Sequence, residues 1–142
     1  MKVSDPDFRS IAESYGDRQD GCLFCVIRSN ELLDENEFCY ASKDAHPATR
    51  QHTLIIPKRH VVDYFELTEL EIVSIHQMLI AMRSRIKNHD LTVTGFNIGV
   101  NVGKNAGQSI PHVHVHLIPR RQGDVENPQG GVRGVIPNKQ KY

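Results

Sequence analysis

Three histidines alternate with apolar residues in the segment His-Val-His-Val-His-Leu-Ile, residues 112–118. Side chains of a β-strand point to opposite faces in turn, so the histidines line one face while the residues between them enter the core. A row of imidazoles buried as ordinary core would leave ring nitrogens without partners, which is costly. The pattern therefore predicts a functional surface formed by His112, His114 and His116.

Two kinds of chemistry use three such imidazoles: binding of a catalytic metal, and nucleophilic or acid–base catalysis on a phosphate. Successive same-side residues of a strand lie about 7 Å apart. Ligands at about 2.1 Å from one ion span only about 4 Å. A flat strand does not easily bring the three rings around one ion, so phosphate chemistry is the better interpretation.

A glycine-rich loop, residues 103–109, precedes the histidines. Its small residues let backbone N–H groups approach an anion, and Gln108 and Ser109 add side-chain donors. Such loops are commonly ordinary turns, so the position of this one carries the argument. Ser109 lies three residues before His112, where a phosphate held by the histidines would sit.

The elements that position these residues are mostly strands around one helix. Thr68 and Glu71 have capping-box spacing, and an apolar stripe of core residues follows, which predicts a helix over 68–87. The stripe consists of Ile72, Ile75, Leu79, Met82 and Ile86. Strands are predicted at 37–41, 52–57, 93–101 and 112–118, and a short helix at 8–15. In the third strand, the predicted packed face carries Phe96, Ile98 and Val100. The order of elements predicts an α+β fold with an antiparallel sheet of about five strands.

Length and charge restrict the class of protein. The 142 residues fit one domain over 1–142, with an N-terminal segment at 1–20 and a C-terminal extension at 121–142. Lys plus Arg and Asp plus Glu number 17 each, which argues against a nucleic-acid surface. No stretch approaches the ~20 apolar residues of a membrane helix, and the N-terminus lacks the hydrophobic region of a signal peptide. We therefore expect a cytoplasmic protein with reduced cysteines, in which Cys22-Leu-Phe-Cys25 is a metal-binding or redox pair.

The segment from Asn101 to Arg120 resembles the signature of the histidine-triad (HIT) superfamily of nucleotide hydrolases and transferases. Residues 51–60, QHTLIIPKRH, are similar to the other sequence block of that family. With Cys22, Cys25 and the predicted helix, the resemblance extends over roughly residues 22–120. It implies a HIT-like fold, a homodimer, and catalysis that requires no metal.

The resemblance also implies roles for individual residues. His114 is the nucleophile that attacks the α-phosphorus and carries the nucleotidyl group until water releases it. His116, Ser109 and Gln108 hold the phosphate oxygens or the leaving group. The substrate-binding and supporting residues around the same pocket are Asn101, Gly107, His52 and Asp44, with Asp44 at the ribose hydroxyls.

The third histidine of the triad bears on the reaction. The uridylyltransferase branch of the family has Gln at this position and the chain has His116, which favours hydrolysis over transfer. The leading substrates are dinucleoside polyphosphates such as diadenosine tetraphosphate, and adenosine phosphoramidates or aminoacyl-adenylates are the alternative. A different class of protein also fits: a regulatory protein that binds purine nucleotides and whose turnover is incidental.

The Cys22-x-x-Cys25 pair resembles the N-terminal knuckle that, in many bacterial-type members, forms a structural zinc site with two histidines. The matching histidines are His60 and His112, and two thiolates with two imidazoles suit tetrahedral zinc. The alternative is a metal-free pair of buried thiols. If His112 binds zinc, catalysis rests on His114 and His116.

The C-terminal extension departs from the small phosphoramidase-like members. Residues 119–124 are similar to the stretch that follows the triad in dinucleoside-polyphosphate hydrolases. The Gly-Gly-Val-Arg133 segment is interpreted as a structural tail, with distal-phosphate binding by Arg133 and docking on a second subunit as alternatives. We assign no role to His46, His76 and His89, and we expect Cys39 to be an ordinary buried residue.

Overall fold

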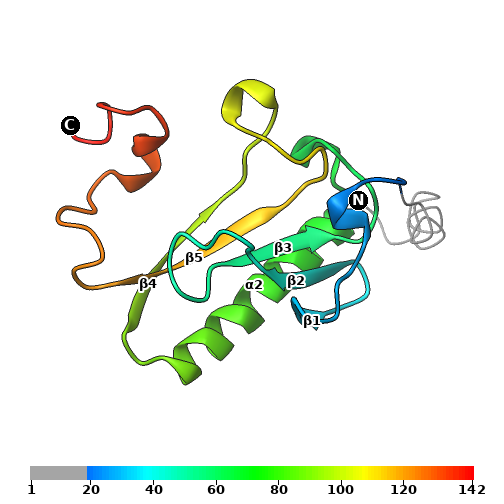
Figure 1. The fold of residues 1–142 in the computed structure, drawn as a ribbon, viewed down its shortest axis with the longest axis horizontal. Coiled ribbons are helices and arrows are strands. Elements are labelled where there is room, and N and C mark those ends of the chain that lie inside the picture. The colour runs from blue at the N-terminus through cyan, green and yellow to red at the C-terminus, as the bar shows by residue number, and fades with distance from the viewer. Residues whose placement is uncertain (1–18) are drawn as a thin grey trace.

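Five strands form one antiparallel sheet in the order β1-β2-β3-β5-β4, with a long helix along one of its faces (Figure 1). The computed structural model describes residues 19–142, so the helix predicted at 8–15 lies outside the described residues. The elements are β1 Leu32–Glu35, β2 Cys39–Lys43, β3 Thr53–Pro57, α2 Glu69–His89, β4 Val93–Gly99 and β5 Val115–Arg121. Short 3₁₀ turns occur at Leu23–Cys25, Tyr64–Glu66, Lys104–Ala106 and Gly131–Val135. The predicted α+β class with a five-stranded antiparallel sheet is confirmed.

The helix α2 begins where the capping box predicts. The Glu71 N–H donates to Thr68 Oγ1 at 3.2 Å, and the Thr68 N–H donates to Glu71 Oε1 at 3.0 Å. The buried Glu71 carboxylate also pairs with Arg59 at 2.7 Å, which holds the segment after β3 against the helix. One position of the predicted stripe is wrong, because Ile72 is exposed, and the core includes Met78, which the stripe omitted. None of the helices within residues 19–142 is long and apolar enough to cross a bilayer.

The two faces of the sheet have different roles. The face toward α2 carries the main core, which includes Val113, Val115 and Leu117, the residues that alternate with the histidines. The opposite face carries a small apolar cluster of Tyr40, Leu54 and Ile56. Leu54 is the β3 partner of His116, so the open face of the sheet is the one that presents the last histidine of the triad.

The strand predicted at 112–118 begins later, at Val115, so the prediction that all three histidines lie on a strand is wrong for His112 and His114. The neighbouring strand β3 ends at Pro57, which has no N–H to continue the ladder. The Pro57 carbonyl accepts a hydrogen bond from His112 Nε2 at 2.8 Å, and the Val113 N–H donates to the Val61 carbonyl at 2.8 Å. These bonds take the place of strand pairing in the segment directly before β5.

The edges of the sheet also differ from expectation. Strand β1 is four residues long and was not predicted, because its sequence Leu-Leu-Asp-Glu lacks the β-branched and aromatic residues that mark strands. At the other edge, Phe96 and Val100 pack against the core as expected, but Ile98 is 55% exposed. The exposure follows from the place of β4 at the edge of the sheet.

The C-terminal segment stands beside β4, away from the helix (Figure 1), and folds back on itself. Gln140 Nε2 donates to the Asn127 carbonyl at 3.3 Å, and the Arg133 guanidinium lies 5.0 Å from the centre of the Tyr142 ring. Gly130 has φ 74°, and a Cβ there would collide with the Gln140 carbonyl oxygen, so only glycine fits. The Arg133 side chain thus contacts Tyr142 of the same C-terminal segment.

Candidate active site

A pocket of about 340 Å³ opens on the face of the sheet opposite α2. We call it the triad pocket. It brings together five of the predicted site residues, which are Asp44, Asn101, Ser109, His114 and His116. Its remaining wall includes the apolar side chains of Leu23, Phe24, Tyr40 and Leu54. A lining that combines these polar groups with apolar side chains suits a ligand with a charged part and a flat apolar part.

The His114 ring is buried and has a defined tautomer. Its Nδ1 lies 2.8 Å from the carbonyl oxygen of His112, and a carbonyl only accepts, so Nδ1 carries the hydrogen. The lone pair is then on Nε2. The edge of the Phe24 ring, whose centre is 4.9 Å from that of His114, restricts the orientation of the imidazole. In its neutral form His114 therefore offers a nucleophilic nitrogen in a fixed orientation.

A backbone amide determines the tautomer of His116 through His52. The Ala48 N–H donates to His52 Nδ1 at 2.9 Å, so the hydrogen of a neutral His52 must be on Nε2. His52 Nε2 lies 2.9 Å from His116 Nδ1 and donates to it. His116 must then carry its own hydrogen on Nε2. The residue lines the triad pocket as a hydrogen-bond donor, and His52 lies behind it.

The group of Asp44, His52 and His116 has the composition of a metal site, with all potential ligand atoms within 4.8 Å of one another. Asp44 Oδ2 lies 3.4 Å from His52 Nε2 and 3.9 Å from His116 Nδ1. A metal would need the lone pair of His52 Nε2, whereas the bond from Ala48 places a hydrogen there. Ala48, His52 and His116 therefore form a chain of hydrogen bonds, which we call the hydrogen-bonded relay. Asp44 lies beside it in the lining of the triad pocket.

The glycine-rich loop, residues 103–109, contributes one residue, Ser109, to the lining of the triad pocket. Gly103 and Gly107 have φ of 88° and 89°, which L side chains rarely adopt. Gln108 does not line the pocket, because Oε1 accepts from the Gly103 N–H at 2.9 Å and Nε2 donates to the Val62 and Ile110 carbonyls at 2.8 and 3.2 Å. Both amide hydrogens are thus used by backbone carbonyls, which leaves Ser109 as the side-chain donor of this loop toward the pocket. Gly107 also lies outside the pocket lining.

Four residues predicted as zinc ligands meet at one point: Cys22, Cys25, His60 and His112. Cys22 Sγ is 3.4 Å from His112 Nδ1, and Cys25 Sγ is 3.2 Å from His60 Nδ1. Ligands of tetrahedral zinc with typical bond lengths lie roughly 3.6 Å apart. The bond from His112 Nε2 to the Pro57 carbonyl keeps Nδ1 available as a ligand. The donor types, distances and tautomer therefore fit zinc.

A family model for the HIT domain matches residues 28–123. The chain belongs to the HIT family. An uncharacterized HIT-like protein of Methanocaldococcus jannaschii is 35% identical over 109 residues, which cover 74% of this chain and 83% of that protein. A bis(5'-adenosyl)-triphosphatase of Dictyostelium discoideum is 33% identical over 102 residues, which cover 72% of this chain and 68% of that protein. The structure of a zinc-bound histidine triad family protein from Mycobacterium smegmatis aligns with a TM-score of 0.60 and 36% identity, over 73% of this chain and 78% of that one.

Some residues of this HIT-family site were not predicted. Phe24 lies between the two cysteines and packs on His114, and the Tyr40 hydroxyl donates to the Phe24 carbonyl at 2.7 Å. The position of Phe24 inside the Cys-x-x-Cys motif was the available signal. No sequence signal marked Ala48, because it acts through its backbone amide and not through its side chain.

Burial favours the neutral forms of the two rings in the relay. It lowers the pKa of His52, an effect that the Asp44 carboxylate opposes. It also lowers the pKa of His116, which the neighbouring His114 and His52 lower further while Asp44 raises it. Both rings of this HIT-family site are therefore neutral at pH 7, as the derived tautomers require.

We expect the His52 and His116 rings to take up protons at a lower pH in the folded protein than in the unfolded chain. The neutral rings then contribute stability that is complete above about pH 6.5 and is lost as the pH falls from that value through the lower pKa of the folded protein. NMR titration of the ring Cε1–H resonances, in buffer and in urea, measures both midpoints. Folded midpoints at or above those in urea would contradict the prediction.

Proposed function

We propose that the chain is a nucleotide hydrolase in which His114 forms a covalent intermediate. The observation that supports this most directly is the bond from His114 Nδ1–H to the His112 carbonyl at 2.8 Å, which leaves the Nε2 lone pair for attack. A neutral imidazole held in this way is a competent nucleophile near pH 7. We expect the protein to act in the cytoplasm, where its cysteines stay reduced.

The reaction has two steps. In the first, His114 Nε2 attacks the α-phosphorus, the bond from phosphorus to the leaving group breaks, and the leaving group departs with the bonding electron pair while His116 Nε2–H donates a hydrogen bond to it. In the second, water attacks phosphorus, the bond to His114 Nε2 breaks, and the proton released by water passes to the departed leaving group or to solvent. A nucleoside monophosphate is released and both rings have their starting protonation. Ser109 and nearby backbone N–H groups stabilise the charge on the phosphate oxygens.

Dinucleoside polyphosphates are the substrates we propose first, in agreement with the printed name of the Dictyostelium relative. The apolar wall formed by Leu23, Phe24 and Leu54 suits a base, Asp44 suits the ribose hydroxyls, and Asn101 lies at the same pocket. Adenosine phosphoramidates and aminoacyl-adenylates have the same nucleotidyl half and differ only in the leaving group. A regulatory nucleotide-binding protein is the alternative of another class.

The substitution His114→Ala is expected to lower kcat by roughly 10⁴-fold or more while AMP still binds, because it removes the nucleophile and leaves the pocket walls in place. Release of AMP from diadenosine tetraphosphate and from an adenosine phosphoramidate measures this, with binding followed by calorimetry. His76→Ala, on the exposed side of α2, is the matched control and should retain activity. A parent protein that binds AMP and turns over neither substrate would favour the regulatory protein.

We also propose that Cys22, Cys25, His60 and His112 bind one structural zinc ion, which would hold the turn at Leu23–Cys25 against the segments after β3 and before β5. The distances and the His112 tautomer support this, as does the zinc-bound relative. Zinc would stabilise the thiolate forms of the cysteines. The ion has no part in the two chemical steps.

Removal of zinc is expected to lower Tm by roughly 10 °C or more, because a tightly bound ion stabilises only the folded state. Elemental analysis should find one zinc per chain in the parent and less in Cys25→Ser. Cys39→Ala, which changes the third buried cysteine, should keep the parent zinc content. A parent that holds no metal and whose Tm is unaffected by a chelator would refute the zinc site.

We further propose a homodimer formed at the edge strand β4. Within residues 19–142 its outer edge has no partner strand, and Ile98 is 55% exposed there. Unpaired backbone groups with an apolar side chain are a template for a second strand. Light scattering should give twice the 16.1 kDa of one chain for the parent and for Leu91→Lys, and the single mass for Ile98→Lys. A parent of single mass would contradict the dimer.

A further inference from the structure

The loop between β2 and β3, residues 44–52, carries both Asp44 and His52, and its shape determines the hydrogen-bonded relay. The Ala48 N–H reaches His52 Nδ1 only because the loop folds back at that point. Gln51, directly before His52, has φ 68°. This left-handed conformation is unfavourable for a non-glycine residue, so contacts from outside the loop must maintain it.

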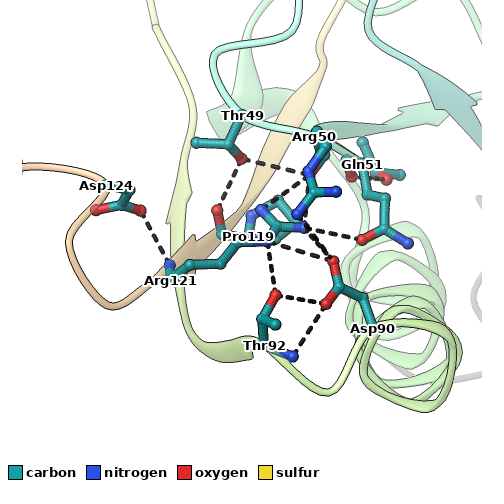
Figure 2. A network of polar contacts seen from close by, with 9 residues as sticks. Thr49, Arg50, Gln51, Asp90, Thr92, Pro119, Arg121 and Asp124 are labelled. Carbon is teal, nitrogen blue, oxygen red and sulfur yellow. Dashed lines mark hydrogen bonds and ion pairs between the residues drawn. The ribbon is translucent and has the colours of Figure 1, made fainter.

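Arg121, at the end of β5, supplies that support (Figure 2). Its side chain is 13% exposed. The Nη atoms donate to the Arg50 carbonyl at 3.4 Å and to Gln51 Oε1 at 3.0 Å. Beside it, Thr49 Oγ1 donates to the Pro119 carbonyl at 2.7 Å. The end of β5 thus holds the three residues before His52.

Asp90, which follows α2, orients the Arg121 guanidinium (Figure 2). Its Oδ2 accepts from Nη2 at 2.9 Å and from Nε at 3.3 Å. The Thr92 N–H donates to Oδ1 at 2.9 Å, and the Asp90 N–H donates to the Ile86 carbonyl at the end of the helix. Hydrogen bonds from Thr92 and Arg121 hold the pKa of Asp90 well below its usual range, so the carboxylate is charged. The helix, the strand and the loop meet at this pair.

We propose that Arg121 and Asp90 are positioning residues for His116, acting through residues 49–52 on the orientation of His52. Neither residue lines the triad pocket. The kinetic part of this inference rests on the proposed function, and its structural part concerns the tautomer of His116 alone.

Loss of the Arg121 bonds has a defined physical consequence. Gln51 relaxes from its strained conformation, and His52 moves with it away from the Ala48 amide. Without that amide, either nitrogen of His52 can carry the hydrogen, and His116 loses its preference for Nε2–H. Misplacement of a catalytic group by about 1 Å costs up to about 10²-fold in rate.

The variant Arg121→Met tests the proposal with two measurements. Long-range ¹H–¹⁵N NMR of the imidazoles reports the His116 tautomer directly, and steady-state kinetics on diadenosine tetraphosphate gives kcat and KM. We expect a single Nε2–H tautomer in the parent, a mixture in the variant, and kcat lower by roughly 10-fold to 100-fold. KM should change less, because much of the triad pocket wall lies outside the loop.

Arg120→Met is the matched control. This neighbour on β5 is also an arginine paired with a carboxylate, Asp124 at 2.8 Å, and no described contact joins its side chain to the 44–52 loop. It should keep the parent tautomer and kcat. Arg121→Lys is the second variant in case Arg121→Met does not fold, because lysine keeps a charge beside Asp90 without the planar fork that reaches Arg50 and Gln51.

The proposal is overturned if a folded Arg121 variant keeps the single Nε2–H tautomer, or if its kcat equals that of the parent. If the parent shows no turnover, the proposed function has failed and the tautomer alone decides. A mixture in the Arg121 variant with a single tautomer in Arg120→Met then supports the positioning role.

Discussion

The buried ring of His112 is the constraint on which the rest of the site depends. Its Nδ1 faces the Cys22 sulfur at 3.4 Å, its Nε2 donates to the Pro57 carbonyl at 2.8 Å, and its own carbonyl accepts from His114 at 2.8 Å. One residue thereby fixes the position of the cysteine turn, the end of β3 and the nucleophilic ring. A change in the orientation of His112 would disturb all three together.

The tautomers of the two other triad histidines depend on main-chain groups. The His112 carbonyl determines that of His114, and the Ala48 amide determines that of His116 through His52. Main-chain carbonyls and amides do not titrate, so the His114 assignment does not depend on the ionisation of a neighbouring side chain, and the His116 assignment depends only on a neutral His52. The polar network around Arg121 extends the same arrangement outward, because its contacts with the loop include the Arg50 carbonyl.

Periodicity and spacing were enough to predict most of the fold. The capping box at Thr68 predicted where α2 begins, and the residues between the histidines are buried as expected. The sequence did not reveal that Gln108 uses both amide hydrogens on the Val62 and Ile110 carbonyls, because those bonds depend on backbone conformation. The contact of His52 with His116 joins residues 64 positions apart, and such pairings follow from strand order, which local patterns do not specify. Ile98 was wrongly predicted to be packed for the same reason, because the place of β4 at the edge of the sheet also follows from strand order.

The position of Phe24 has a thermodynamic consequence. The residue belongs to the turn that carries both cysteines, and its ring centre lies 4.9 Å from that of His114 and 6.1 Å from that of His112. A ligand that shifts this ring acts on the cysteine turn, and an ion held by the turn acts on the ring. Linkage requires that two such binding events change each other's affinity by the same factor. With favourable coupling, scarcity of the ion would weaken nucleotide retention, and abundant nucleotide would slow loss of the ion.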